Sequence, residues 1–139
     1  MNTKRLGKIG GAWWLAGLLS VGGFGTAYAH HVIVDTGYIL KNKDKPGVVL
    51  VDARGASAYK KGLIPGAAVL GEKPGQVALR DVDARVLPVK KLEKILGEAG
   101  LTRGNEIIVY GAKGDTGPTV VFWILEYLGV EKAKVYLGG

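Results

Sequence analysis

The stretch Val48 to Leu70, V-V-L-V-D-A-R-G-A-S-A-Y-K-K-G-L-I-P-G-A-A-V-L, decides the fold of this chain. It opens with an apolar, valine-rich run at residues 48–51 that follows Pro46-Gly47 and is too short for a helix, so it predicts a buried strand. Asp52 and Arg54 come directly after this run. Because open parallel sheets gather polar groups at the carboxyl ends of their strands, these two are candidates for a site or for an ion pair that braces the sheet edge.

The second half of the stretch predicts a tight return of the chain to the sheet. A helical turn is expected over Ser57 to Lys61, closed by Gly62. Ile64-Pro65-Gly66 then predicts a turn, in which the proline sets φ and Gly66 is free to adopt a positive φ. Residues 67–70 are again apolar and predict a second short strand.

Three patterns in this stretch resemble a known family. They are Asp52-x-Arg54, Tyr59-x-x-Gly62 and Gly62-x-Ile64-Pro65-Gly66-Ala67. Together they resemble the first signature of rhodanese-like sulfurtransferase domains. The family usually has histidine where this chain has Leu63. The resemblance implies an α/β fold with a parallel central sheet flanked by helices. The alternative is an ordinary strand and turn in some other α/β domain.

The remainder of the chain alternates strand and helix patterns. Ile107 to Tyr110 and Ala133 to Leu137 predict strands, and Pro88 to Gly97 and Thr119 to Leu128 predict amphipathic helices. In the second helix a further apolar face accompanies the main one, so we expect this helix to be buried broadly; that face consists of Val120, Trp123 and Tyr127. Strands that alternate with helices predict a parallel sheet covered on both faces.

Two segments lack a clear pattern. Val32 to Lys41 is ambiguous, although Asp35 or Thr36 could cap a short helix there, and the resemblance implies a short helix before the first central strand. Gly71 to Pro88 has no clear periodicity and carries many charges, which favours a surface loop.

The first 29 residues have the features of a secretory signal peptide. A positive start with Lys4, Arg5 and Lys8 precedes an apolar stretch, and Ala27-Tyr28-Ala29 has the small-x-small pattern of a cleavage site. We expect export, to the periplasm in a Gram-negative source, a domain over residues 30–139, and no stable membrane association after cleavage. The alternative is an uncleaved anchor, since residues 9–29 reach the length of about 20 that spans a bilayer, although several glycines weaken such a helix.

Composition excludes several classes of function. The chain has no cysteine, so it can form neither a disulfide nor a cysteine-based metal site. Its formal net charge of +7 includes the basic residues of the leader, and the other basic residues are scattered without interleaved aromatics, which argues against a nucleic-acid surface. The two histidines, His30 and His31, are adjacent and cannot alone complete a metal's coordination sphere. We expect no metal and no cofactor.

The loop between residues 107–110 and the following helix decides the chemistry. In the resembled family a cysteine follows this strand, and the loop wraps around it so that backbone N–H groups and the helix dipole stabilise a thiolate or persulfide. By the strand match that position is Gly111, so we expect no catalytic residue. The expected active-site-like loop consists of Gly111, Ala112, Lys113, Gly114, Asp115, Thr116 and Gly117.

Other interpretations of this loop remain open. Residues 111–119 superficially resemble a phosphate-binding loop, but the lysine before the final serine or threonine is missing. A glycine-rich turn before a helix could hold a small anion weakly, and the simplest alternative is a shortened connector without a ligand. Neither glycine nor a nearby side chain can carry sulfane sulfur, so the chain as given cannot perform rhodanese chemistry or that of the cysteine-dependent phosphatases with the resembled fold.

The resemblance extends to tandem thiosulfate and 3-mercaptopyruvate sulfurtransferases, whose amino-terminal domain lacks the cysteine that the carboxy-terminal domain carries. Similar to that amino-terminal domain are Arg85-Val86-Leu87-Pro88, Trp123 and the closing Tyr136-Leu137-Gly138-Gly139. Val120 departs from it, since arginine is usual there. The family continues with a further loop and helix, so the resemblance implies a domain that is incomplete at its C-terminal end.

We therefore expect a catalytically silent rhodanese-like domain that works beside a C-terminal rhodanese domain in a longer sulfurtransferase. The alternative is a stand-alone, non-catalytic module that binds a protein partner or a small anion. An uncleaved leader would make it a membrane-anchored structural domain. The expected signature residues are Asp52, Arg54, Tyr59, Gly62, Ile64, Pro65, Gly66, Gly138 and Gly139.

Overall fold

The computed structural model describes residues 31–70 and 75–138 of this chain. The expected signal peptide of residues 1–29, His30 and the signature residue Gly139 lie outside the described residues. Among the helices in the described ranges, none is both long and apolar enough to cross a bilayer.

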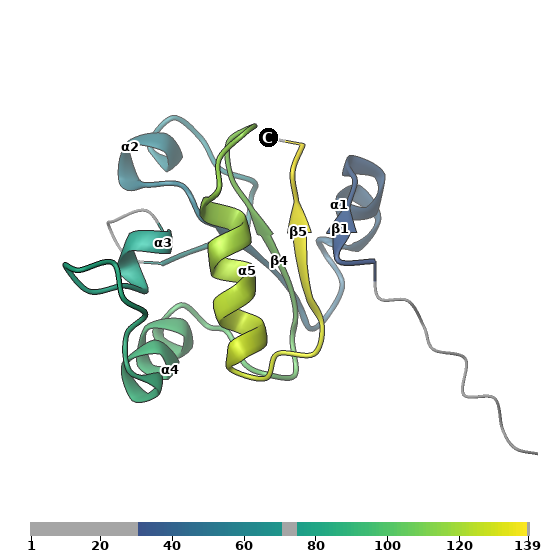
Figure 1. The fold of residues 1–139 in the computed structure, drawn as a ribbon. Coiled ribbons are helices and arrows are strands. Elements are labelled where there is room, and N and C mark those ends of the chain that lie inside the picture. The colour runs from purple at the N-terminus through teal and green to yellow at the C-terminus, as the bar shows by residue number, and fades with distance from the viewer. Residues whose placement is uncertain (1–30, 71–74, 139) are drawn as a thin grey trace, which may run out of the picture.

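Five parallel strands form the centre of the domain, in the order β1-β5-β4-β2-β3 (Figure 1). They are β1 Ile33–Val34, β2 Val48–Asp52, β3 Ala68–Val69, β4 Glu106–Tyr110 and β5 Ala133–Tyr136. The two central strands, β2 and β4, pair in a register that sets Asp52 opposite Tyr110. The predicted parallel sheet is confirmed, and β1 is an addition that the ambiguous pattern around Asp35 did not reveal.

Helices cover both faces of the sheet. They are α1 Thr36–Asn42, α2 Ala56–Tyr59, α3 Gly75–Ala78, α4 Val89–Glu98 and α5 Gly117–Tyr127. In Figure 1, α5 crosses in front of the sheet with α3 and α4 on one side of it, and α1 lies beside β1 at the other side. The Asp35 side chain caps α1 by accepting a hydrogen bond from the Tyr38 N–H at 2.8 Å, which confirms one of the two caps that the sequence allowed.

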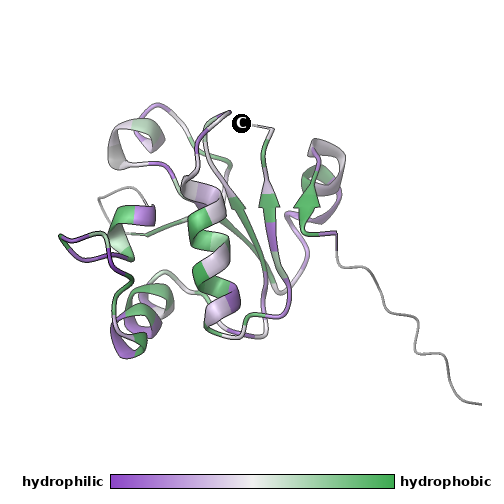
Figure 2. Cartoon of the chain, viewed as in Figure 1, coloured by the Kyte–Doolittle hydropathy of each residue, from purple (hydrophilic) through white to green (hydrophobic). Residues whose placement is uncertain are grey.

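Alternate residues of the strands build two apolar clusters, one on each face of the sheet. The larger cluster packs Val51 and Ile107 against α4 and α5. The smaller cluster packs Leu50 and Ile108 against Ile39 of α1. This alternation follows from the period of two along a strand, and Figure 2 shows hydrophobic residues concentrated on the strands.

The interpretation of residues 71–88 as a surface loop is wrong in part. Residues 75–78 form α3, and Leu79 is completely buried in the larger cluster. Arg80 and Val86 then form an antiparallel bridge. One turn of helix is too short to show a period, and a single leucine among charged residues gives no apolar pattern, so the sequence could not indicate this packing.

The expectation that α5 is also buried on a second apolar face is wrong for Trp123 and Tyr127, whereas Val120 is partly buried against the larger cluster. Val121 and Ile124 are completely buried, as predicted for the main face. Trp123 and Tyr127 are instead 55% and 60% exposed, and their rings stack on each other with centroids 5.9 Å apart. A helix that lies on a sheet needs only one apolar stripe to cover it, which leaves the second stripe on the outside.

Trp123→Ala should cost far less stability than Leu125→Ala in the same helix. Leu125 is completely buried, so its truncation removes apolar contacts and leaves a cavity, at a cost of about 3 kcal/mol in the free energy of unfolding. For the exposed tryptophan we expect a loss below about 1 kcal/mol. Urea unfolding of the two variants measures both values, and equal losses would show that Trp123 is buried after all.

Candidate functional site

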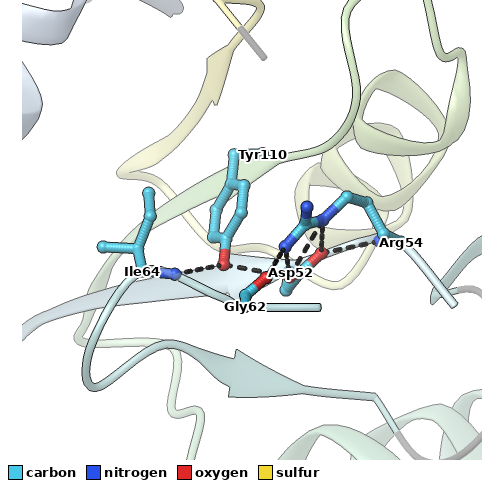
Figure 3. Close-up of polar contacts among 5 residues, drawn as sticks. All are labelled: Asp52, Arg54, Gly62, Ile64 and Tyr110. Carbon is cyan, nitrogen blue, oxygen red and sulfur yellow. Dashed lines mark hydrogen bonds and ion pairs between the residues drawn. The ribbon is translucent and has the colours of Figure 1, made fainter. Parts of the chain in front are cut away.

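The polar residues of the signature gather at the carboxyl edge of the sheet. Asp52 ends β2 and Tyr110 ends β4, and their parallel register brings the two side chains together on the same face. Arg54 follows two residues after Asp52 and folds back over it (Figure 3). The turn at Gly62 and Ile64 closes the cluster from the side.

Asp52 is completely buried and is surrounded by hydrogen-bond donors. Arg54 donates from Nε to Oδ1 at 2.9 Å and from Nη2 to Oδ2 at 2.6 Å, a bidentate pair, and its backbone N–H donates to Oδ1 at 2.9 Å. The Tyr110 hydroxyl donates to Oδ2 at 3.0 Å. These four bonds and the opposite charge compensate the carboxylate for its lost hydration.

The same cluster ties the turn to the sheet. Arg54 Nη2 also donates to the carbonyl of Gly62 at 2.9 Å, and the Ile64 N–H donates to the Tyr110 hydroxyl at 3.2 Å. The Arg54 guanidinium lies 5.6 Å from the centroid of the Tyr110 ring, within cation–π range. Gly66 has a φ of +81°, as the predicted turn requires. The network therefore links β2, β4 and the turn at residues 62–66.

Burial and hydrogen bonding act in opposite directions on the titration of this cluster. For Asp52, burial is the largest single influence and by itself raises the pKa, but the bonds from Arg54 and Tyr110 with the Arg54 charge together hold the pKa below its usual value. The hydrogen bond to Asp52 raises the pKa of Arg54. Burial raises the pKa of Tyr110. At neutral pH the cluster is therefore an ion pair with a neutral phenol.

The loop after β4 has no room for a side chain at its first residue. Gly111 is buried, and a Cβ added to it would lie 2.6 Å from Pro118 Cγ and 3.0 Å from Pro118 Cδ. Hydrogen bonds within the loop also occupy two of its backbone N–H groups. The Asp115 carboxylate accepts a hydrogen bond from the Gly117 N–H at 2.9 Å, while the Asp115 N–H donates to the Ala112 carbonyl at 3.0 Å. The start of α5 thus already faces a carboxylate.

A hollow of about 410 Å³ joins the cluster to this loop. Its walls include Arg54, Tyr110, Gly111 and Tyr136, with Leu63 at the place where the resembled family has histidine. In the described part of the chain, no three histidine, aspartate or glutamate residues are grouped closely enough to hold a metal. The hollow can offer hydrogen bonds and the Arg54 charge, but no thiol.

The structure brings together some of the predicted site residues and separates others. Asp52, Arg54, Gly62, Ile64 and Gly111 meet at one edge. Pro65 and Gly66 belong to the turn that borders this edge, and Asp115, which accepts a hydrogen bond from the Gly117 N–H, approaches Gly111. Of the remaining predicted residues, Tyr59 is in α2, Gly138 packs against the ring of Tyr136, and Ala112, Lys113, Gly114 and Thr116 are exposed.

Sequence reasoning missed Tyr110 and Pro118 as members of this site. The sequence pattern places Tyr110 only in a strand, and its position opposite Asp52 depends on the register of β2 and β4. Knowledge of the parallel pairing would have indicated Tyr110, because the last residues of neighbouring strands meet at one edge. The contact of Pro118 with Gly111 had no signal in the sequence.

Comparisons with known proteins agree with this arrangement. A family model described as "Rhodanese-like domain" matches residues 35–139. The thiosulfate sulfurtransferase of Azotobacter vinelandii is 29% identical over 94 residues, which cover 68% of this chain and 35% of that protein. This chain therefore spans about a third of the length of the curated relative that it matches.

Solved structures are similar in fold. SseA from Escherichia coli, described among 3-mercaptopyruvate sulfotransferases, matches with a TM-score of 0.65 and 23% identity over 78% of this chain and 40% of that one. An anaerobic ergothioneine biosynthesis enzyme from Chlorobium limicola matches with a TM-score of 0.67 and 20% identity over 78% of this chain and 28% of that one. At such identities the likeness concerns the fold alone.

Proposed function

This chain belongs to the family of rhodanese-like domains, and we propose that it is the catalytically silent N-terminal domain of a tandem sulfurtransferase. A second rhodanese domain, with the cysteine that this chain lacks, would follow in the same polypeptide and carry the sulfur in transit. The coverage of the curated relative supports this arrangement, because the residues aligned with this chain make up only 35% of that thiosulfate sulfurtransferase. The donor of that whole protein would be thiosulfate or a mercapto acid.

The geometry at Gly111 carries the proposal that the domain is silent. Sulfur transfer by this family needs a thiolate at the start of the loop, held by backbone N–H groups. Here the position is a glycine whose missing side chain is replaced by the ring of Pro118, and the Asp115 carboxylate occupies the N–H of Gly117. Because the side-chain position is filled and the helix N-terminus already has a carboxylate as its partner, this loop suits a structural role.

The polar cluster then has a scaffold role. Its ion pair joins the buried Asp52 carboxylate to the partly exposed Arg54, and its hydrogen bonds connect two central strands with the turn at residues 62–66. Such a network holds the carboxyl edge in one conformation, which a second domain can pack against. Asp52 and Arg54 therefore brace the sheet edge in this proposal and contact no substrate.

A sulfur-transfer assay tests the silent role. The full chain is incubated with thiosulfate and cyanide, and thiocyanate is measured beside the Azotobacter vinelandii relative as a positive control. We expect no turnover above a heat-denatured sample of this chain. Thiocyanate formation that scales with the concentration of folded protein would mean that a group other than cysteine carries sulfur and that the domain is catalytic.

The tandem arrangement has a separate test. The native polypeptide that contains this domain is isolated, and its mass and downstream sequence are determined. We expect a second domain with a cysteine after its own central strand. A native protein that ends shortly after Gly139 would remove the tandem proposal and leave the stand-alone module.

A stand-alone module for a small anion has one favourable observation, the hollow of about 410 Å³ beside Arg54. Titration of the full chain with thiosulfate, sulfite and phosphate, followed by amide NMR, tests it. This candidate requires saturable shifts at Gly62 and Gly111, which border the hollow. Unchanged spectra would eliminate it and would leave the scaffold role intact.

We also propose that the protein is exported. The support is the basic start, apolar stretch and Ala27-Tyr28-Ala29 of the leader. N-terminal sequencing of protein recovered from a Gram-negative periplasm should begin at His30. Recovery of the uncut chain in the membrane fraction would instead indicate an anchor.

A further inference from the structure

A second hollow, of about 620 Å³, lies beside α3. It is formed by α3 and by the hairpin loop, residues 80–86, which projects at the left of Figure 1. Apolar groups and one arginine share its walls. The lining residues are Gln76, Val77, Arg80, Asp81, Val82 and Ala84. None of these residues lines the hollow beside Arg54, so a ligand here would be independent of the proposed function.

The hairpin loop is held in one conformation by its own hydrogen bonds. Its ends form the antiparallel bridge, and the Asp81 N–H donates to the Arg85 carbonyl at 2.8 Å. The Asp81 side chain accepts hydrogen bonds at Oδ1 from the N–H groups of Asp83 and Arg85, both at 2.9 Å. Ala84 has a φ of +60°, which is an unfavourable conformation for a residue with a side chain. The hollow is therefore preformed, as binding sites usually are.

One of the lining residues has a buried donor without a partner. Arg80 Nε is shielded from solvent, and no atom of residues 31–70 and 75–138 accepts a hydrogen bond from it. Nearly all buried polar groups in proteins have a partner, so an orphaned N–H indicates an acceptor that the chain itself does not supply. The neighbouring Arg85 differs, because it pairs with Asp83 at 3.3 Å. Since Nε makes no internal hydrogen bond, the Arg80 guanidinium can turn towards the hollow without losing one there.

We propose that Arg80 binds a small carboxylate with a short apolar tail in this hollow. A guanidinium presents Nε–H and Nη2–H as a parallel pair, which matches the two oxygens of a carboxylate. Val77, Val82 and Ala84 offer methyl groups to the tail. Asp81 carries a negative charge at the same hollow, and this charge repels a doubly charged ligand more strongly than a singly charged one. The ligand class is therefore a monocarboxylate such as isovalerate.

NMR of the full 139-residue chain tests this ligand class, with the Nε–Hε signal of Arg80 as the direct readout. Isovalerate is titrated in parallel with isovaleramide, a neutral molecule of the same shape, and with inorganic phosphate. We expect a saturable low-field shift of the Arg80 Hε proton with isovalerate. Isovaleramide should bind about tenfold more weakly, because a hydrogen bond to a charged acceptor is stronger than one to a neutral acceptor. No saturable shift, equal binding of the amide or tighter binding of phosphate would overturn the proposal.

Two matched variants locate the site. Arg80→Lys keeps the positive charge but loses the paired donors, so isovalerate should bind about tenfold more weakly, as measured at the amides of Val82 and Ala84. Arg85→Lys is the same change in the same loop, at an exposed side chain that pairs with Asp83, and it should leave the affinity within about twofold of the parent chain. Amide spectra outside the hairpin loop verify that both variants are folded. Undiminished binding in Arg80→Lys, or an equal loss in Arg85→Lys, would contradict the site.

Discussion

Asp52→Ala is expected to lower the free energy of unfolding by about 3 kcal/mol. The carboxylate is completely buried and receives donors from Arg54 and Tyr110. Its removal leaves the Arg54 guanidinium and the Tyr110 phenol without the carboxylate that accepts their hydrogen bonds. The free-energy cost of leaving the guanidinium charge unpaired exceeds that of losing the hydrogen bonds themselves. The estimate is at the low end of the range for buried pairs because the Arg54 side chain is 23% exposed and can regain some water.

Asp83→Ala provides a matched control on the surface. Asp83 pairs with Arg85 at 3.3 Å, but the two side chains are 61% and 76% exposed. Such a pair contributes little, so we expect a change within about 0.5 kcal/mol. Urea unfolding at neutral pH measures both variants. If Asp52→Ala is no more destabilising than Asp83→Ala, the buried cluster does not hold the sheet edge.

The same carboxylate should make the fold sensitive to acid. The pKa of Asp52 is held below its usual value of 3.8 in the folded chain, so folding favours the ionised form. Its contribution is fully present above the unfolded pKa and is lost as pH falls through the lower, folded pKa. The free energy of unfolding should therefore decline from about pH 5 downward, and less steeply in Asp52→Asn. Identical pH profiles for the two chains would refute the link.

Gly111→Cys is expected to restore no sulfur transfer and to destabilise the domain by about 2 kcal/mol. The new Cβ would lie 2.6 Å from Pro118 Cγ, so the start of α5 must shift to admit it. Ala112→Cys, at an exposed position of the same loop, is the control and should be almost neutral. Urea unfolding and the thiosulfate–cyanide assay measure the two effects. Equal stability of both variants would mean that the loop has room for a side chain.

A double variant distinguishes two reasons for the absence of sulfur transfer. One is the lack of space for a side chain at residue 111, and the other is the lack of groups that would lower the pKa of a thiol there. Gly111→Cys with Pro118→Ala removes the ring that occupies the position and should regain part of the lost stability. Sulfur transfer should still be absent, because an Asp115 oxygen lies 3.5 Å from the new Cβ and its negative charge raises the pKa of the introduced thiol. The pH dependence of alkylation measures that pKa. A value below the ordinary one of about 8.5 would contradict this account of the loop.

The local patterns of the sequence predicted most of the fold. The apolar runs at residues 48–51 and 107–110, the turn at Gly66 and the capping residue Asp35 all act within a few residues. Each of them is indicated by a few neighbouring residues, and their positions agree with the structure to within one or two residues. The resemblance carried by the signature then indicated the family, which the match over residues 35–139 confirms.

The sequence by itself determined that cysteine-dependent sulfur transfer is impossible in this chain, because it contains no cysteine. It also determined the order of strands and helices, because hydrophobic periods of two and of 3.6 residues are visible in the residues alone. Only the tertiary structure decided which residues meet. Asp52 and Tyr110 are 58 positions apart, and the register of β2 and β4 brings them together. In the same way, packing placed Pro118 against Gly111 and left Trp123 outside. Such contacts depend on the register and packing of elements distant in sequence, which no local pattern encodes.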